Sequence, residues 1–301
     1  MTEGEILERL RRRIRWPRNS ELIAGIGDDC AIYRPRASRE DLVLTTDMLI
    51  EGVHFETSTH RPSDIGHKAL ARGLSDIAAM GAQPRFCLLS LALAPHTDGK
   101  WIERFYNGLL ALSERHRAVL AGGDLSHSDR ITCDIVVVGG VPRGKALLRS
   151  GALAGDAIYV SGGLGGSALG LATGRGAAKR RHLRPEPRVE LGQFLRTRLH
   201  ATAAMDLSDG LSLDLARMCR ASGTSADIEC LPLFPGATPE QALHGGEDYE
   251  LLFTVSPKTR VPARHAAVPL TRIGTMQRES VGRVFLNGRP LAALGYDHFR
   301  Q

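Results

Sequence analysis

The spacing of apolar and polar positions predicts helices and strands that alternate along the chain. Leu70, Leu74 and Ile77 repeat at helical spacing within 68–80, and 98–115 has the pattern of a second long helix. The apolar stretches 85–94 and 131–141 have the length of buried strands. Further helices are expected at 3–13, 188–199 and 211–222, and further strands at 22–33, 42–55, 118–122, 157–160, 226–230 and 251–255, before a hairpin at Asn287-Gly288. This alternation favours a mixed α/β layer architecture.

Acidic residues follow four of the apolar runs. A single aspartate at such a place usually caps a helix or forms a turn, because its side chain bonds to nearby backbone groups. Four acidic strand ends in one chain, with a further aspartate at the margin of the 68–80 helix, indicate a shared site. Carboxylate oxygens are the ligands that hard cations prefer. The candidate carboxylates are Asp28, Asp29, Asp47, Asp76, Asp124, Asp206 and Asp209.

The length of 301 residues exceeds the usual size of a single core, so two domains of roughly 150 residues are expected. The basic, turn-rich segment 142–151 marks the boundary, which gives domains 1–147 and 148–301. With 43% hydrophobic and 24% charged residues, the chain has the composition of a soluble globule. It has no apolar run of the roughly 18 to 20 residues that span a bilayer, and its first residues lack signal-peptide regions. A cytoplasmic location is therefore expected.

The five cysteines are isolated in sequence and form no Cys-x-x-Cys pair. This pattern predicts reduced, mostly buried thiols and argues against structural zinc and a disulfide framework. None of the five lies in a glycine-rich turn beside a histidine, so a catalytic thiol is not expected either.

The formal charge of +6 is concentrated in two basic runs, Arg9–Arg18 and Arg175–Arg188. Aromatic residues make up 5% of the chain and do not interleave with either run, so nucleic acid is not expected as a partner. The favoured interpretation is that both runs form solvated helix faces and a loop. Steering of an anionic small substrate by a basic surface is the alternative.

The glycine-rich segment Ser161–Ser167 follows a predicted strand and opens a helix. Such a turn can present backbone N–H groups to a phosphate, or it can be a tight connection without a ligand, and the sequence leaves both open. The chain has no Gly-x-x-x-x-Gly-Lys-Ser/Thr motif. The segment is also a marginal dinucleotide match, because no acidic residue ends a second strand about 20 positions later.

Several ordered motifs together resemble those of the bacterial thiamine-monophosphate kinase family, over nearly the whole length. The resemblance implies an α/β (α+β) two-domain fold shared with aminoimidazole ribonucleotide synthetase and selenophosphate synthetase. It also implies a homodimer paired through the N-terminal domains, with a C-terminal α/β domain that completes the active site. The motifs are Gly25-Ile26-Gly27-Asp28-Asp29-Cys30-Ala31, Thr45-Thr46-Asp47, the Asp76 helix, Gly122-Gly123-Asp124, Arg149-Ser150-Gly151, Asp206-Leu207-Ser208-Asp209-Gly210 and Gly245-Gly246-Glu247-Asp248-Tyr249-Glu250.

The same resemblance implies a reaction and a site. ATP as co-substrate would phosphorylate thiamine monophosphate to thiamine diphosphate, the last step in making that cofactor, with several Mg²⁺ ions bound. The implied magnesium ligands are Asp29, Thr45, Thr46, Asp47, Asp76, Asp124, Asp206 and Asp209. The implied nucleotide contacts are Tyr106, Gly123, Asp124, Arg149 and Ser208, and the implied thiamine-phosphate contacts are His54, Glu247 and Tyr296. Asp28 would support its neighbour Asp29.

Phosphoryl-transfer chemistry is consistent with many aspartates and no evident base. The second pKa of a phosphate monoester is about 6, so the attacking oxygen is largely ionised at neutral pH. Repulsion between anions is then the main obstacle, and carboxylate-bound Mg²⁺ ions reduce it. Two alternatives remain. One is another ATP-dependent synthetase of this fold, although the N-terminus lacks the cysteine expected of a selenophosphate synthetase. The other is a non-catalytic ATP-binding regulator, although no ligand carboxylate is lost.

Overall fold

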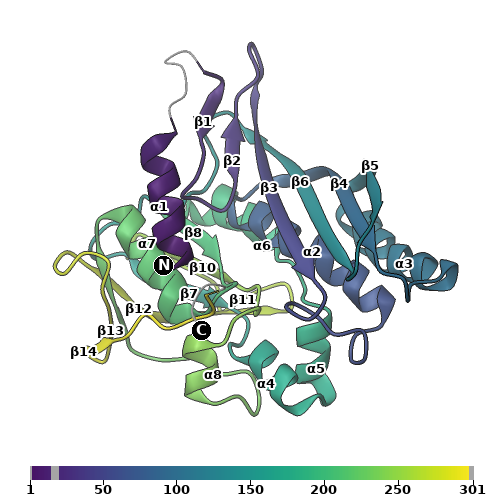
Figure 1. Cartoon of the computed structure of the whole chain (residues 1–301). Coiled ribbons are helices and arrows are strands. Elements are labelled where there is room, and N and C mark those ends of the chain that lie inside the picture. The colour runs from purple at the N-terminus through teal and green to yellow at the C-terminus, as the bar shows by residue number, and fades with distance from the viewer. Residues whose placement is uncertain (1, 15–19, 298–301) are drawn as a thin grey trace.

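The structure is a computed structural model that describes residues 2–14 and 20–297 (Figure 1). The N-terminal half of the chain forms a six-stranded sheet. The strands are β1 (Leu22–Ala24), β2 (Ala31–Tyr33), β3 (Glu40–Ile50), β4 (Gln83–Leu93), β5 (Val119–His127) and β6 (Thr132–Pro142). They lie in the order β1-β2-β3-β6-β4-β5 and run antiparallel, except that β4 and β5 are parallel. The alternation of faces along β3 decides which of its side chains reach the interior.

The C-terminal half forms an eight-stranded sheet. Its strands are β7 (Ala157–Ser161), β8 (Ala203–Asp206), β9 (Ser225–Ile228), β10 (Leu251–Val255), β11 (Arg264–His265), β12 (Val268–Gln277), β13 (Val284–Leu286) and β14 (Arg289–Leu291). The order is β14-β13-β9-β12-β7-β10-β8, with β11 paired to β12. All pairs are antiparallel except β13 with β9. The hairpin of β13 and β14 turns at Asn287 and Gly288, whose positive φ angles of 51° and 74° confirm the predicted turn.

Helix α2 (Pro62–Ala79) packs against strands of both sheets. It contacts β3 and β6 on one side and β8 on the other. Pro62 stands in its first turn, where a missing N–H costs nothing, and the chain leaves the helix at Gly81, whose φ is 63°. Leu70 and Leu74 are completely buried, as the helical spacing predicted. Any polar side chain on the inner faces of α2 is therefore held between the two halves of the molecule.

A glycine allows α2 to lie close against the first sheet. A Cβ atom added at Gly73 would be 2.5 Å from the Cγ2 atom of Val137 on β6. Val137 is buried and branched, so it could not move aside easily. The close approach places the neighbouring side chains of Arg72, Ser75 and Asp76 against the middle of β3 and the end of β8.

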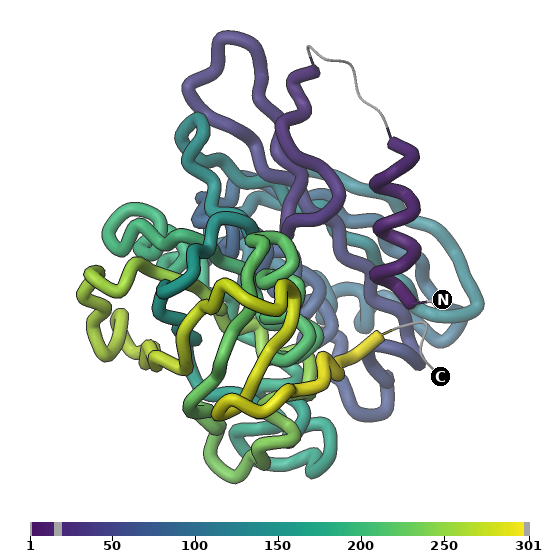
Figure 2. Tube along the Cα trace, turned by 90° about the vertical axis from the view of Figure 1, so that its left-hand side faces the viewer, coloured from purple at the N-terminus to yellow at the C-terminus, as the bar shows by residue number. Residues whose placement is uncertain are grey.

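The other helices surround this central arrangement. They are α1 (Glu3–Arg13), α3 (Gly99–His116), α4 (Gly166–Thr173), α5 (Gly176–Leu183), α6 (Val189–Phe194), the π-helical turn η1 (Leu195–Leu199), α7 (Leu211–Ser222) and α8 (Pro239–His244). Asp98 caps α3 by accepting a hydrogen bond of 2.7 Å from the Trp101 amide. Figure 2 shows the start of α1 and the last described residues side by side, and the Glu3 amide lies 3.3 Å from Oδ1 of Asp297.

Most sequence expectations agree with these elements, but several differ. The predicted strand at 118–122 continues to His127, the segment expected as a strand over 22–33 is divided into β1 and β2, and the helix predicted at 188–199 is divided into α6 and η1. The elements β11, β12 and α8 were not predicted. The cysteine expectation is confirmed, because all five are free and Cys230 is the one exposed. Among the described residues, no helix has the length and apolar character that crossing a membrane requires.

The interpretation of the second basic run as a solvated surface is wrong for part of it. Arg181 and Arg188 both bind the fully buried carboxylate of Glu250, and each guanidinium is mostly buried itself. Arg184 pairs with Asp64 at the start of α2 at 3.0 Å. These arginines therefore join α5 and its following loop to the rest of the molecule. In the first basic run, residues 15–19 lie outside the described part of the chain.

Candidate active site

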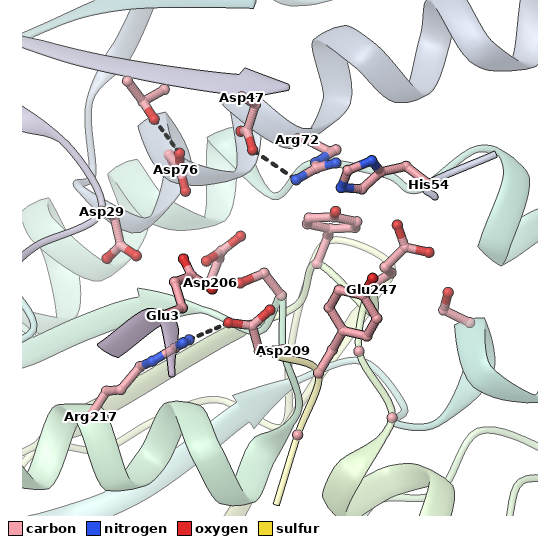
Figure 3. Close-up of a pocket in the computed structure, with 18 of the residues that line it drawn as sticks. Glu3, Asp29, Asp47, His54, Arg72, Asp76, Asp206, Asp209, Arg217 and Glu247 are labelled. Carbon is pink, nitrogen blue, oxygen red and sulfur yellow. Dashed lines mark hydrogen bonds and ion pairs between the residues drawn. The ribbon is translucent and has the colours of Figure 1, made fainter. Parts of the chain in front are cut away.

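A cavity of about 990 Å³ lies where α2 meets the loops of the C-terminal half (Figure 3). Pockets of roughly 300–1,000 Å³ accommodate small ligands, so this one is large enough for substrates of nucleotide size. Most of the residues singled out in the sequence line it. They are Asp28, Asp29, Thr45, Thr46, Asp47, His54, Asp76, Arg149, Asp206, Ser208, Asp209, Glu247 and Tyr296.

Three carboxylates from distant parts of the chain meet at one point in this cavity. Asp29, Asp76 and Asp206 each offer an oxygen within 4.8 Å of the other two. Asp206 ends β8 and accepts a hydrogen bond of 2.7 Å from the Ser75 hydroxyl, and the Thr45 hydroxyl donates to Asp76. The α2 helix thus supplies both a carboxylate and a group that orients another.

Electrostatics at this cluster favour a bound cation. Burial, together with the charges of neighbouring aspartates, raises the pKa of Asp76 and of Asp206 well above the ordinary value. Oδ2 of Asp29 is buried and has no hydrogen-bond partner within the described residues. Carboxylates this close cannot all ionise without compensation, and Mg²⁺ takes carboxylate oxygens as ligands. The donor set therefore fits the divalent cation expected from the sequence.

Strand β3 directs its two threonines to opposite faces of the sheet. Thr45 and Asp47 point toward α2, whereas the Thr46 hydroxyl donates a hydrogen bond of 2.7 Å to Asp134 on the other face. The Thr46 side chain therefore points away from the Asp29–Asp76–Asp206 cluster. The sequence did not single out Asp134.

Arginines pair with three of the predicted metal-binding aspartates. The Arg149 guanidinium is 2.6 Å from Asp29, Arg72 is 3.0 Å from Asp47, and Arg217 binds Asp209. The carboxylate of Asp28 accepts the backbone N–H of both Asp29 and Arg149, which agrees with a supporting role. Burial and the charge of Asp29 raise the pKa of Asp28 to about 7.

A second polar cluster lies on the other side of the cavity. Glu247 has a left-handed φ of 65°, and its amide donates to the Ser208 carbonyl at 2.7 Å. Its carboxylate lies 2.8 Å from the ammonium of Lys68, which is completely buried, and 3.3 Å from Nδ1 of His182. Burial opposes its charge, but Lys68 and His182 outweigh this and lower the pKa of Glu247. The Lys68 ammonium also lies 3.4 Å from the His54 carbonyl.

The segment 245–250 explains the glycine-rich turn that the sequence left open. Asp248 accepts hydrogen bonds from the amides of Gly165 at 2.6 Å and of Ser167 at 3.1 Å. These amides at the start of α4 are thus occupied by a carboxylate of the same chain, which favours a tight connection over a phosphate site. Glu250 has no access to the cavity and binds Arg181 and Arg188 instead.

Three predicted contacts lie outside the cavity. Tyr106 is on α3, with its ring centroid 5.6 Å from that of Phe105. Gly123 and Asp124 are on the exposed edge strand β5, where Asp124 pairs in register with Ser90 on β4. Strands are about 4.8 Å apart, so β5 lies on the order of 14 Å from β3, across β4 and β6. Within one chain, Asp124 cannot share an ion with Asp47.

Sequence reasoning did not identify several polar residues at the site, although α2 carried a signal for them. Lys68, Arg72 and Ser75 recur at helical spacing with the predicted Asp76 on a helix whose other positions are mostly apolar, so they share one side of it. Charged residues at such spacing on a buried helix indicate buried partners. Arg217 is a different case, because it lies on α7 and nothing in its spacing distinguishes it from a surface residue.

Comparisons with known proteins identify two family models and several thiamine-monophosphate kinases that resemble this chain. The family models that match are AIR synthase related protein, N-terminal domain, over residues 27–141, and AIR synthase related protein, C-terminal domain, over residues 154–287. The thiamine-monophosphate kinase of Escherichia coli (strain K12) is 40% identical over 303 residues, covering 91% of this chain and 91% of the relative. That of Bacillus subtilis (strain 168) is 36% identical, covering 94% and 95%.

A solved structure is similar along the whole chain. AaThiL complexed with AMPPCP and TMP has a TM-score of 0.86 and 32% sequence identity, and the match covers 99% of this chain and 97% of that chain. The thiamine-monophosphate kinase from Stenotrophomonas maltophilia K279a has a TM-score of 0.77 and 36% identity, covering 95% and 96%. The sequence relatives and these solved structures therefore point to the same kind of protein, thiamine-monophosphate kinases.

Proposed function

The chain belongs to the thiamine-monophosphate kinase family, and from that premise we propose that its cavity transfers the γ-phosphoryl group of ATP directly to thiamine monophosphate. The enzyme phosphorylates thiamine monophosphate with ATP as co-substrate, giving thiamine diphosphate and ADP. One observation supports this site most strongly: a single cavity combines the Asp29–Asp76–Asp206 cluster with the separate cluster around Glu247. The two clusters suit the phosphate end and the thiamine end of the acceptor.

Magnesium fits the acidic cluster. Asp29, Asp76 and Asp206 would hold it, and Asp47 and Asp209, which line the same cavity, would be further ligands. When bound, Mg²⁺ neutralises charge on the phosphates that must approach one another. The chain itself fixes the ligands before any ion arrives, because Ser75 orients Asp206 and Thr45 orients Asp76.

No side chain is assigned as a base or as a nucleophile. The attacking atom is an oxygen of the acceptor phosphate, which is already ionised at neutral pH because its second pKa is about 6. Arg149, which pairs with Asp29, and Ser208, two positions after Asp206, both line the cavity, which supports their assignment as nucleotide contacts. Phosphoryl transfer then depends on alignment and charge neutralisation rather than on proton abstraction.

The thiamine end of the acceptor suits the cluster around Glu247. Lys68 keeps the Glu247 carboxylate ionised, so it is an acceptor for the amino group of a pyrimidine ring. Tyr296 lines the cavity and is 48% exposed, so its ring can offer a face to a cationic heterocycle. His54 stands between this cluster and Asp47, so it completes the substrate contacts of the proposal.

We propose further that the enzyme works as a homodimer joined through the first sheet. Helices α2 and α3 cover one face of this sheet, and the other face carries exposed apolar side chains. By register these are Tyr33, Met48, Phe86, Leu88 and Val119, each at least 36% exposed. Asp124 lies on the same face, so in this proposal it acts as a metal ligand toward the second copy. The ATP requirement supports a cytoplasmic location.

An assay of ADP release with a panel of acceptors tests the function. Thiamine monophosphate should support turnover, whereas thiamine should not, because it brings no ionised phosphate. Asp206→Asn should lower kcat by about 100-fold or more, because it removes a charge from the centre of the cluster. Asp227→Asn, on β9 and away from the cavity, is the matched control. Turnover that requires a formamidine or selenide acceptor would assign the chain to a sister synthetase, and binding of ATP without turnover would indicate a regulator.

A further inference from the structure

Arg72 occupies the place where the acidic side of the cavity meets the thiamine side. Its Nη2 atom donates to Oδ1 of Asp47 at 3.0 Å, and its Nη1 atom donates to the Met48 carbonyl at 3.2 Å. The side chain is 14% exposed and lines the cavity. Figure 3 shows the guanidinium between Asp47 and His54. Nothing in the proposed function gives it a role.

The Asp47–Arg72 pair conflicts with the role proposed for Asp47. A carboxylate oxygen that binds a divalent cation cannot also accept a hydrogen bond from a guanidinium in the same direction, and two neighbouring cations repel each other. Loading Asp47 with metal would therefore weaken its hold on Arg72. The guanidinium would still be fixed to α2, and α2 cannot retreat because Gly73 packs directly against Val137.

Arg72 has hydrogen-bonding capacity that its present partners do not use. A guanidinium has five N–H donors, and the Nε atom of Arg72 is buried without a partner in the described part of the chain. Nearby Asp47, Glu247 and Asp76 outweigh burial and keep the arginine charged, although the buried ammonium of Lys68, one turn earlier on α2, is also close to it. A planar, charged fork with free donors matches a phosphate group, which it can bind through two oxygens at once.

We propose that Arg72 binds the phosphate of the acceptor, and that it pairs with Asp47 only while no metal is bound there. This inference rests on the proposed function, because it deepens the account of how that site takes thiamine monophosphate. The acceptor phosphate must lie between the metal-binding carboxylates and the cluster that holds the thiamine moiety. Arg72 lies at that boundary and directly contacts Asp47, one of the metal-binding carboxylates.

The proposal has a thermodynamic consequence. Metal at Asp47 frees Arg72 for the phosphate, and phosphate at Arg72 frees Asp47 for the metal. Coupling of this kind is reciprocal, so metal and thiamine monophosphate should each strengthen the binding of the other. In a purely structural role, Arg72 would orient Asp47 at all times, and its loss would weaken metal binding.

The test separates these two roles by measuring metal and acceptor independently. Mn²⁺ is used as the probe ion, and its binding to the full-length protein without substrates is measured by electron paramagnetic resonance. The KM for thiamine monophosphate is measured at saturating Mg²⁺ and ATP. Arg72→Met should raise this KM by about 10- to 100-fold, as expected for the loss of charge-assisted hydrogen bonds. The same variant should bind Mn²⁺ as tightly as the wild type or more tightly, because Asp47 loses a competing cation.

Two further variants complete the design. Arg72→Lys keeps the charge without the planar fork, so its KM for thiamine monophosphate should lie between those of the wild type and Arg72→Met. If Arg72→Met does not fold, the KM of Arg72→Lys still tests whether the guanidinium binds the acceptor phosphate. Arg34→Met is the matched control, because it breaks a mostly buried pair with Asp41 away from the cavity. It should change neither Mn²⁺ binding nor the KM.

The results of these measurements distinguish a failure of the Arg72 inference from a failure of the proposed function. Weaker Mn²⁺ binding in Arg72→Met with a KM for thiamine monophosphate within about twofold of the wild type would overturn the inference and leave the proposed function intact. A wild-type protein that does not consume thiamine monophosphate would overturn the proposed function and this inference with it. A raised KM with Mn²⁺ binding preserved supports the assignment of Arg72.

Discussion

The ammonium of Lys68 lies 2.8 Å from Oε1 of Glu247, and this ion pair joins the helix between the sheets to the loop that precedes β10. Lys68 is completely buried, whereas the Glu247 side chain is 27% exposed and faces the cavity. The same ammonium lies 3.4 Å from the His54 carbonyl. One buried charge thus positions two of the residues proposed to hold the thiamine moiety.

Replacing Lys68 by Met should affect stability and substrate binding together. Removing one member of a buried ion pair is expected to cost about 3–5 kcal/mol, because the other charge is left without compensation. The KM for thiamine monophosphate should rise much more than the KM for ATP, since Glu247 loses its fixed orientation. Urea unfolding and steady-state kinetics measure the two effects. The double variant Lys68→Met, Glu247→Gln should recover stability but not acceptor binding, and recovery of both would contradict the positioning role.

Glu250 should be important for stability without affecting chemistry directly. Burial disfavours its charge, but Arg181 and Arg188 outweigh burial and lower its pKa to about 2. Because the pKa of Glu250 is lower in the folded protein than in the unfolded chain, its ionised carboxylate stabilises the fold. This stabilisation is complete above the unfolded pKa, near 4.5, and is lost as the pH falls through the folded pKa of about 2. Glu250→Gln should therefore cost about 3–5 kcal/mol at neutral pH, and the difference from the wild type should shrink in acid.

Urea unfolding at several pH values measures this difference. Glu229→Gln is the control, because its pair with Arg272 is about half exposed on both sides, and such pairs contribute about 0–1 kcal/mol. A Glu250→Gln variant as stable as the Glu229→Gln control at neutral pH would show that the buried network is not stabilising.

Stabilisation by Mg²⁺ should increase with pH. Burial and Asp29 raise the pKa of Asp28 from 3.8 to about 7, and burial with neighbouring charges raises those of Asp76 and Asp206. When the pKa of a carboxyl group is higher in the folded protein than in the unfolded chain, the metal-free protein loses stability as the pH rises from about 4 to about 7. Mg²⁺ binds the ionised forms, so its effect on Tm should be larger at about pH 8 than at about pH 6. An equal shift in Tm at both pH values would contradict the assignment of Asp76 and Asp206 as ligands.

The open face of the first sheet should carry the dimer interface. Sedimentation of the wild type should show a homodimer, and Leu88→Glu should produce a monomer, because it places a charge among the apolar side chains of that face. Val281→Glu is the control, since Val281 is 58% exposed in the C-terminal half. A wild-type monomer with full activity, or a dimer that persists in Leu88→Glu, would exclude this interface.

The sequence predicted most of the elements, and most of the residues that line the cavity, for identifiable physical reasons. The period of apolar residues predicted α2 and most of the buried strands, and acidic residues expected at strand ends identified carboxylates of the cavity, although Asp47 lies within β3 rather than at its end. Strand periodicity alone would also have separated Thr45 from Thr46, because neighbouring strand residues face opposite sides of a sheet. The partners of the charges were harder to predict. Arg188 and Glu250 are 62 positions apart, and only the tertiary fold brings them together.

Other features depend on contacts that the sequence does not encode locally. The turn at 161–167 has the composition of a phosphate loop, and its amides are used by Asp248, which lies about eighty positions further along. The exposure of β5, and with it the separation of Asp124 from Asp47, follows from the strand order β3-β6-β4-β5, which local patterns do not determine.

The most direct test of the account follows the transferred phosphoryl group. ATP labelled in the γ-phosphate is incubated with the enzyme, Mg²⁺ and thiamine monophosphate, and the label in products and in protein is measured during turnover. Direct in-line transfer predicts that the label appears in thiamine diphosphate, that ADP is the other product, that thiamine remains unlabelled, and that no labelled protein is trapped. Labelled protein that passes its label to the product would contradict direct transfer, as would label released as inorganic phosphate without thiamine diphosphate.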